Sequence, residues 1–169
     1  MANITQERLK ELLQYDPQTG HFYWRVRTTN RIHVGDLAGT FRDPKRDGYR
    51  RIKVEGRLYY AHRLAWLYVH GEWPKGEIDH KGLDPERNHM QNLRPATRSQ
   101  QVANSRKRAM SKNPFKGVDF HKGRKKPWHA RLTKDYRCMC LGYYATAEEA
   151  HEAYFRAAQI HFGDFAHRG

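Results

Sequence analysis

The chain has 169 residues, of which 32 are Lys or Arg and 18 are Asp or Glu, so its formal net charge is +14 at pH 7. This length allows one domain or two small ones, and the excess of positive charge favours a nucleic acid as the partner. No apolar run approaches the ~20 residues of a membrane-spanning helix, and two cysteines are too few for a four-cysteine zinc site.

The first half of the chain alternates short helical and strand patterns. Thr5 can cap a helix over residues 5–14, a turn follows at 16–20, and residues 21–27 alternate as a strand. Residues 49–54 and 58–60 predict a hairpin around the turn at 55–56. Residues 62–70 then predict a compact apolar helix that ends at Gly71.

The most informative stretch begins at Ile78-Asp79-His80. A carboxylate that can hold a divalent cation, beside a neutral imidazole that can take a proton from water, suits the hydrolysis of a phosphodiester. Neighbours within a strand point to opposite faces, so the pair is expected at a strand end, where Gly82 helps the chain to turn. A second short strand at 91–93 and a helix over 98–108, capped by Thr97, would complete a ββα core at about 76–108.

Positive charge is concentrated after this core. Residues 98–126 contain ten Lys and Arg but one acid, Asp119. Such a run can be a solvated face, but between two DNA-facing units it favours a linker that follows the phosphate backbone. The predicted domains are therefore 1–108 and 109–169, and the linker residues expected to bind DNA are Arg106, Lys107, Arg108, Lys125 and Lys126.

The last third of the chain predicts a small sheet and a helix. Residues 116–121, 128–133 and 137–143 read as strands, with Met139, Leu141 and Tyr143 on one face, and a capping box at Thr146 begins a helix that runs to about 162. The polar face of this sheet favours the reading of a DNA groove over the alternative, an ordinary solvated sheet face. Its predicted DNA contacts are His121, His129, Arg131 and Thr133.

The first part of the chain resembles the HNH nucleases of the phage and intron-encoded homing type. The resemblance rests on motifs in register between residues 49 and 107: Ala61-His62-Arg63-Leu64-Ala65-Trp66, Trp73-Pro74, Ile78-Asp79-His80, Asn88, Asn92-Leu93-Arg94 and Thr97-Arg98-Ser99-Gln100. It implies that His80 is the general base, that Asp79 binds one Mg²⁺ or Mn²⁺, and that Asn92 braces the loop and orients the histidine. The second ligand, usually His or Asn, falls on Gln101, whose amide oxygen remains a usable ligand.

Several alternatives stay open around this site. Asn104, on the same helix face as Gln101, is a rival ligand. Asn88 either fixes the turn or touches the metal, His89 fits a solvated loop, and His62 fits a structural position in the core.

The last part of the chain, from Phe115 to about His167, resembles the plant ethylene-response-factor (Apetala-type) DNA-binding domain. The matching residues are Lys116-Gly117-Val118, Trp128-His129-Ala130-Arg131, Leu141-Gly142-Tyr143-Tyr144, Thr146-Ala147-Glu148-Glu149-Ala150, Ala153-Tyr154 and Ala157-Ala158. The resemblance implies a three-stranded sheet in the major groove. Most Arg and Trp positions of the plant members are replaced here, so it does not transfer a base preference.

These patterns together predict an α+β protein, with an HNH ββα domain preceded by β-hairpins and a three-stranded antiparallel sheet packed on one helix. The expected function is metal-dependent endonucleolytic hydrolysis of double-stranded DNA, nicking as a monomer. Reduced Cys138 and Cys140 favour a cytoplasmic location, in a bacterial host if the chain is phage-encoded, without structural zinc. The alternatives are a catalytically weakened DNA-binding regulator and a binder of structured RNA.

Overall fold

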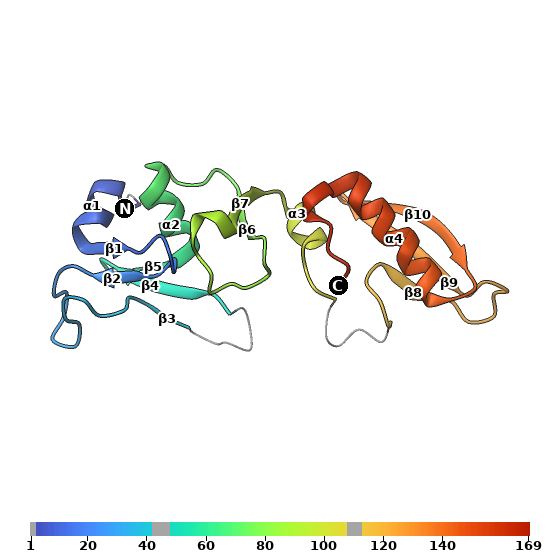
Figure 1. Cartoon of the computed structure of the whole chain (residues 1–169), viewed down its shortest axis with the longest axis horizontal. Coiled ribbons are helices and arrows are strands. Elements are labelled where there is room, and N and C mark those ends of the chain that lie inside the picture. Colours follow the sequence, from blue (N-terminus) through green and yellow to red (C-terminus); the bar gives the residue numbers. More distant parts are fainter. Residues whose placement is uncertain (1–2, 42–47, 108–112) are drawn as a thin grey trace. The chain divides into compact units, whose positions relative to one another are not determined.

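A computed structural model describes residues 3–41, 48–107 and 113–169 of the chain (Figure 1). Packing divides the chain into two compact units, Met1–Pro95 and Ala96–Gly169. The elements are helices and small sheets, as the α+β prediction requires.

The first unit begins with a helix and a hairpin. Thr5 caps α1 (Gln6–Leu12) by accepting a hydrogen bond from the Arg8 N–H, and β1 (Leu13–Tyr15) pairs with β2 (Phe22–Trp24). The helix predicted to reach residue 14 ends earlier, because Leu13 adopts an extended backbone and pairs with Trp24. Pairing with a distant strand therefore overrides the local helical pattern.

A three-stranded sheet and a helix follow. The strands are β3 (Thr40–Phe41), β4 (Arg50–Val54) and β5 (Arg57–Tyr60), in the order β3-β4-β5. Helix α2 (Ala61–His70) ends at Gly71, whose φ of 79° is left-handed. The predicted hairpin and helix are confirmed to within two residues, whereas β3 falls outside every predicted strand.

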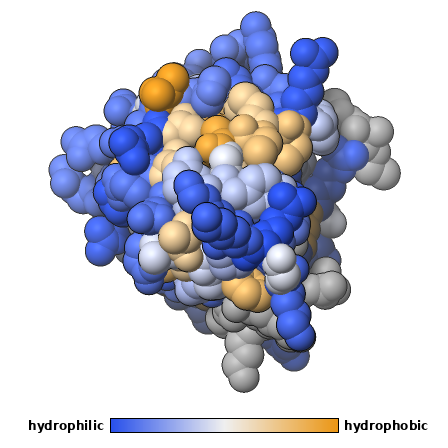
Figure 2. All heavy atoms as spheres, turned by 90° about the vertical axis from the view of Figure 1, so that its right-hand side faces the viewer, coloured by the Kyte–Doolittle hydropathy of each residue, from blue (hydrophilic) through white to orange (hydrophobic). Residues whose placement is uncertain are grey.

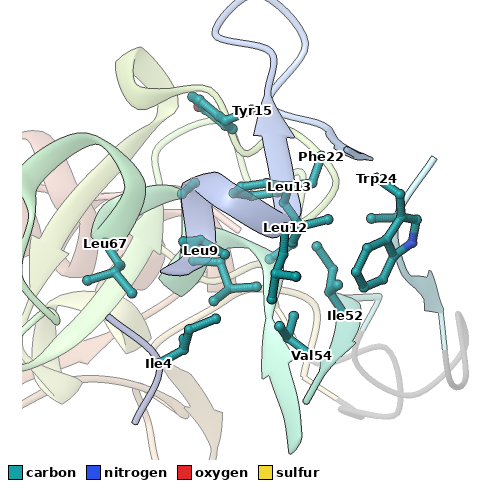
Figure 3. Close-up of a cluster of buried hydrophobic side chains, with 14 of the residues drawn as sticks. Ile4, Leu9, Leu12, Leu13, Tyr15, Phe22, Trp24, Ile52, Val54 and Leu67 are labelled. Carbon is teal, nitrogen blue, oxygen red and sulfur yellow. The ribbon is translucent and has the colours of Figure 1, made fainter. Parts of the chain in front are cut away.

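Apolar side chains from these elements form the core of the first unit (Figure 3). Helix α1 contributes Leu9 and Leu12, and the sheet contributes Ile52 and Val54. Complete burial of one such side chain stabilises the fold by roughly 1.5–3 kcal/mol. The same core includes Ile78 and Leu93, so it also holds the two strands that follow.

Two short strands carry the residues singled out in the sequence. β6 (Glu77–His80) and β7 (Leu93–Ala96) form a two-stranded sheet, and a 3-10 turn, η1 (Met90–Asn92), leads into β7. The second strand thus begins at Leu93 rather than at residue 91. These are the two strands of the predicted ββα core.

Helix α3 (Arg98–Ala103) is shorter than predicted. Thr97 and Gln100 form the expected capping box, but the helix ends at Asn104. The Ala103 carbonyl accepts hydrogen bonds from Lys116 Nζ at 2.6 Å and from the His167 N–H at 3.2 Å, so tertiary partners replace the next helical turn. Because α3 packs with the C-terminal elements, the packing boundary lies after Pro95, upstream of the one predicted at residue 108.

The rest of the second unit is a sheet covered by one helix. The strands β8 (Val118–Phe120), β9 (Trp128–Lys134) and β10 (Arg137–Tyr144) are antiparallel, in the order β10-β9-β8, and α4 (Ala147–Phe162) packs on them. The predicted sheet, helix and Thr146 capping box are confirmed. A bulge between Cys140 and Gly142 shifts the register, so Tyr143 stacks on His129 of the outer face instead of joining Met139 and Leu141 inside.

No helix in the described part of the chain is long and apolar enough to cross a membrane.

Gly20 should be intolerant of any side chain. Its φ is 78°, and an added Cβ would lie 2.3 Å from the His89 main-chain nitrogen. Gly56 has a similar φ of 82° but open space around it. We expect Gly56→Ala to lower the free energy of unfolding by about 1 kcal/mol and Gly20→Ala by about 3 kcal/mol, because only the second adds a clash to the backbone cost. Chemical denaturation measures both, and equal losses would contradict the close approach.

His62 should make the protein less stable in acid. Its side chain is 8% exposed and packs against the rings of Tyr49, Tyr60 and His80. Burial, with smaller contributions from nearby His80 and Arg63, lowers the pKa of His62 from 6.5 to about 3. Below pH 6.5, His62 is therefore protonated in the unfolded chain but stays neutral in the folded chain. The free energy of unfolding falls as the pH falls.

Between pH 6.5 and 5 this linkage removes about 2 kcal/mol. His62→Phe should flatten that part of the stability curve in urea unfolding experiments. His70→Gln, a change at an exposed position of the same helix, is the matched control and should leave the slope as it is. An unchanged slope in His62→Phe would show that other groups cause the acid sensitivity.

Candidate active site

Asp79 and His80 are the last two residues of strand β6, so the pair lies at a strand end as expected. Both are buried, at 7% and 5% exposure, and Gly82 follows where the chain turns. The Asp79 carboxylate accepts a hydrogen bond from Arg94 Nε at 2.9 Å, across the two-stranded sheet. A buried anion is costly without a partner, so Arg94 allows a charged carboxylate to remain at this position.

Asn88 determines which nitrogen of His80 carries the proton. Asn88 Nδ2 donates to the Glu86 carbonyl at 3.0 Å, so Oδ1 is the atom that faces His80 Nε2 at 2.9 Å. An amide oxygen only accepts, and therefore Nε2 carries the hydrogen. Nδ1 is left as the basic nitrogen of the ring, which is the tautomer needed to take a proton from water.

The loop that presents Asn88 is held from behind. The Tyr15 hydroxyl donates to the Asn88 carbonyl at 2.8 Å, and Gly20 lies against the Asn88–His89 peptide. Asn88 itself is 1% exposed. The N-terminal hairpin thus fixes the residue that orients His80.

Asn92 joins the two ends of the same loop. Its Oδ1 accepts from the Gly82 N–H at 2.9 Å, and its Nδ2 donates to the Arg87 carbonyl at 2.7 Å. The Lys81 N–H also donates to the Asn92 carbonyl. These bonds tie Lys81, Gly82 and Arg87 to one residue, and the bracing role that the resemblance implies for Asn92 stays a prediction.

His80 lies in a low-polarity aromatic environment. Its ring meets His62 edge-on, with centroids 5.2 Å apart, and lies 5.7 Å from the ring of Tyr49. Burial lowers the pKa of His80, and this is opposed by the bond to Asn88 and the charge of Asp79. The lowered pKa favours the neutral, basic form of the ring at neutral pH.

The proposed second ligand lies on a different unit. Gln101 is half-buried on α3, while its rival Asn104 is 3% exposed and forms the end of that helix. His89 is half-buried beside Asn88. Within the described ranges, no three His, Cys, Asp or Glu side chains cluster to hold a metal ion. In the first unit Asp79 is the predicted hard-oxygen ligand, chemically suited to Mg²⁺, and Arg94 shares its carboxylate.

The predicted DNA contacts of the second unit lie on its outer surface. His121, Arg131 and Thr133 are exposed and His129 is half-buried, while Lys125 and Lys126 are exposed in the loop before β9. Arg131 is paired with Asp119, which also accepts from Asn113. Arg108 lies outside the described residues.

Figure 2 shows one face of the molecule, where a small hydrophobic patch is surrounded by hydrophilic residues.

A cavity of about 390 Å³ in the second unit is bordered by Arg106 and Lys107 of the predicted linker. Lys116 lies in its wall and donates to the Ala103 and Ser105 carbonyls, and burial lowers its pKa to about 8. Lys107 donates to the Asn113 carbonyl. Part of the basic run therefore holds the fold together rather than lying free in solvent.

Three residues that interact with the candidate site residues were not identified from the sequence. Arg94 was part of a quoted motif, and its position two residues after Asn92, on the strand paired with β6, could have suggested a partner for Asp79. Tyr143 and Arg124 extend the His129 stack, with the guanidinium 4.4 Å from the Tyr143 ring centre. The sequence gives no local signal for Tyr143 and Arg124, because the bulge moves Tyr143 to the other face of the sheet.

Two comparisons with known proteins found a match to part of this chain. Residues 59–103 match the model of the HNH endonuclease family. A solved structure of the HNH homing endonuclease I-HmuI, a protein that binds and cleaves DNA, has 26% identity and a TM-score of 0.41, over 54% of this chain and 50% of that one. The chain thus spans about half the length of that relative, and no curated protein sequence matches. Asp79, His80, Asn88 and Asn92 all lie within the residues that match the HNH endonuclease model.

Proposed function

We propose that this chain is a metal-dependent endonuclease that nicks double-stranded DNA. The observation that carries the proposal is the orientation of His80, whose Nε2 is bound by Asn88 so that Nδ1 is basic, next to Asp79 in the HNH domain. The net charge of +14 supports a phosphate polymer as the substrate.

Each residue of the site has a distinct task. His80 Nδ1 takes the proton from the attacking water, Asn88 fixes the ring, and Asn92 holds the loop in shape. Asp79, with Gln101 as the proposed second ligand, would hold one Mg²⁺ or Mn²⁺, which supplies Lewis-acid stabilisation of charge on the scissile phosphate. Arg94 orients the Asp79 carboxylate through its 2.9 Å bond.

The second unit is proposed to target the nuclease, as a DNA-binding domain of the ethylene-response-factor (Apetala) type. Its support is the three-stranded antiparallel sheet packed on α4, with His121, His129, Arg131 and Thr133 on the outer surface. We assign Arg106, Arg108, Lys125 and Lys126 to the phosphate backbone; Lys107 would have to exchange its bond to the Asn113 carbonyl for a phosphate to join them.

Loss of His80 should abolish practical cleavage. We expect His80→Ala to slow the nicking of supercoiled plasmid with Mg²⁺ by roughly 10²- to 10⁴-fold, because the general base is removed. DNA affinity should change little. His89→Ala removes a neighbouring histidine without the Asn88 bond and should remain active.

The same assay separates the alternatives. Nicking that a chelator stops supports the enzyme, whereas tight duplex binding without any nicking would identify a DNA-binding regulator. Preference for structured RNA over duplex DNA would favour the RNA-binding alternative. A fully active His80→Ala protein would refute the assignment of the base.

Asn88 should act through the orientation of His80. We expect Asn88→Ala to reduce kcat by about 10- to 100-fold, as is usual when a partner that orients an active-site histidine is removed, with DNA affinity preserved. Gln91→Ala, an exposed position in η1, is the control and should keep its rate. Circular dichroism and thermal unfolding check that both variants fold, and an equal kcat for both would show that His80 needs no such support.

A further inference from the structure

The turn between β9 and β10 breaks the usual rules for a hairpin. Its two central residues, Asp135 and Tyr136, have φ values of 48° and 63°. Asn and Gly suit this left-handed region, whereas a bulky aromatic residue is strained there. Tyr136 is nevertheless present, and its side chain is 93% exposed, so burial does not compensate for the strain.

Two cations stand on either side of this tyrosine. Lys134 and Arg137 are direct register partners across the hairpin. Like charges directly opposite on neighbouring strands destabilise a sheet. Asp135 lies between them, but its carboxylate accepts a hydrogen bond from the Ser99 hydroxyl at 3.0 Å. The strain and the charge repulsion therefore occur together at one hairpin tip.

The tip is also held firmly in place. The Asp135 N–H donates to Ser99 Oγ at 2.9 Å, and Ser99 Oγ donates back to the Asp135 carboxylate. Ser99 belongs to α3, so a helix of the same unit anchors the turn at two points. A turn that is anchored in this way fixes the backbone from which the Tyr136 side chain extends into solvent.

We propose that this hairpin tip is a DNA-contacting element, in which the Tyr136 ring packs against a nucleotide while Lys134 and Arg137 bind the phosphates on either side. An aromatic face between cations is the usual combination for nucleotides, since the ring stacks on a base or sugar and the cations neutralise the backbone. Local costs that cluster at one place are typical of functional sites. The inference rests on the proposed function, because it requires that the chain binds DNA.

The test uses the left-handed backbone of Tyr136 to separate an effect on DNA binding from an effect on folding. Gly suits a φ of 63°, so Tyr136→Gly should unfold at the same or a higher temperature than the parent protein while it binds DNA about tenfold more weakly. Tyr136→Phe keeps the aromatic face and should bind within about twofold of the parent. Ile160→Gln removes another exposed apolar side chain of this unit, 81% exposed on α4, and should leave affinity unchanged. The probe is a labelled duplex of random sequence, with a chelator present to prevent cleavage.

The salt dependence of binding distinguishes the ring from its neighbours. Lys134→Ala and Arg137→Ala should each reduce the slope of log affinity against log salt by about 1, whereas Tyr136→Gly should lower affinity without changing the slope. If Tyr136→Gly binds as tightly as the parent protein, the inference is overturned while plasmid nicking by the parent protein still supports the proposed function. If the parent protein neither binds duplex DNA nor nicks plasmid, the inference and the proposed function are both wrong.

Discussion

The hydrogen bond between Asn88 Oδ1 and His80 Nε2 is the contact on which the site depends. It selects the tautomer, and it can do so only because Asn88 is fully buried and its amide is oriented by the Glu86 carbonyl. Tyr15 and Gly20 hold the main chain of that residue. The N-terminal hairpin, outside the matched HNH segment, thus supports the proposed chemistry through contacts to Asn88, which in turn binds His80 Nε2.

The residues of the candidate site could be found from the sequence to the extent that their signals are local. Asp79 and His80 are neighbours at the end of a predicted strand, so the chemistry of the pair located them, whereas Asn92 was located by the resemblance to HNH nucleases. Tyr15 is separated from Asn88 by 73 positions, and its bond reflects how the core packs the hairpin against the loop. Such support is set by tertiary packing and leaves no periodic pattern.

The elements show the same division between local and distant causes. The helix beginning at Thr146 was predicted correctly because its capping box lies within four residues. Leu13 was assigned to a helix because its pairing with Trp24 is not visible locally. Tyr143 was placed inside the sheet because the alternation ignores the bulge at Cys140 and Gly142. The first error comes from a distant strand partner, and the second from an irregularity in the pairing of two strands.

The ion pair between Asp79 and Arg94 shows how this unit can bury a carboxylate in advance of any ligand. The side chains are 8% and 13% exposed, and an isolated anion at that depth would be strongly disfavoured. Arg94 compensates part of this cost through the bond from its Nε to one carboxylate oxygen of Asp79. The buried ion pair therefore suits a site that must keep its carboxylate charged before a cation binds.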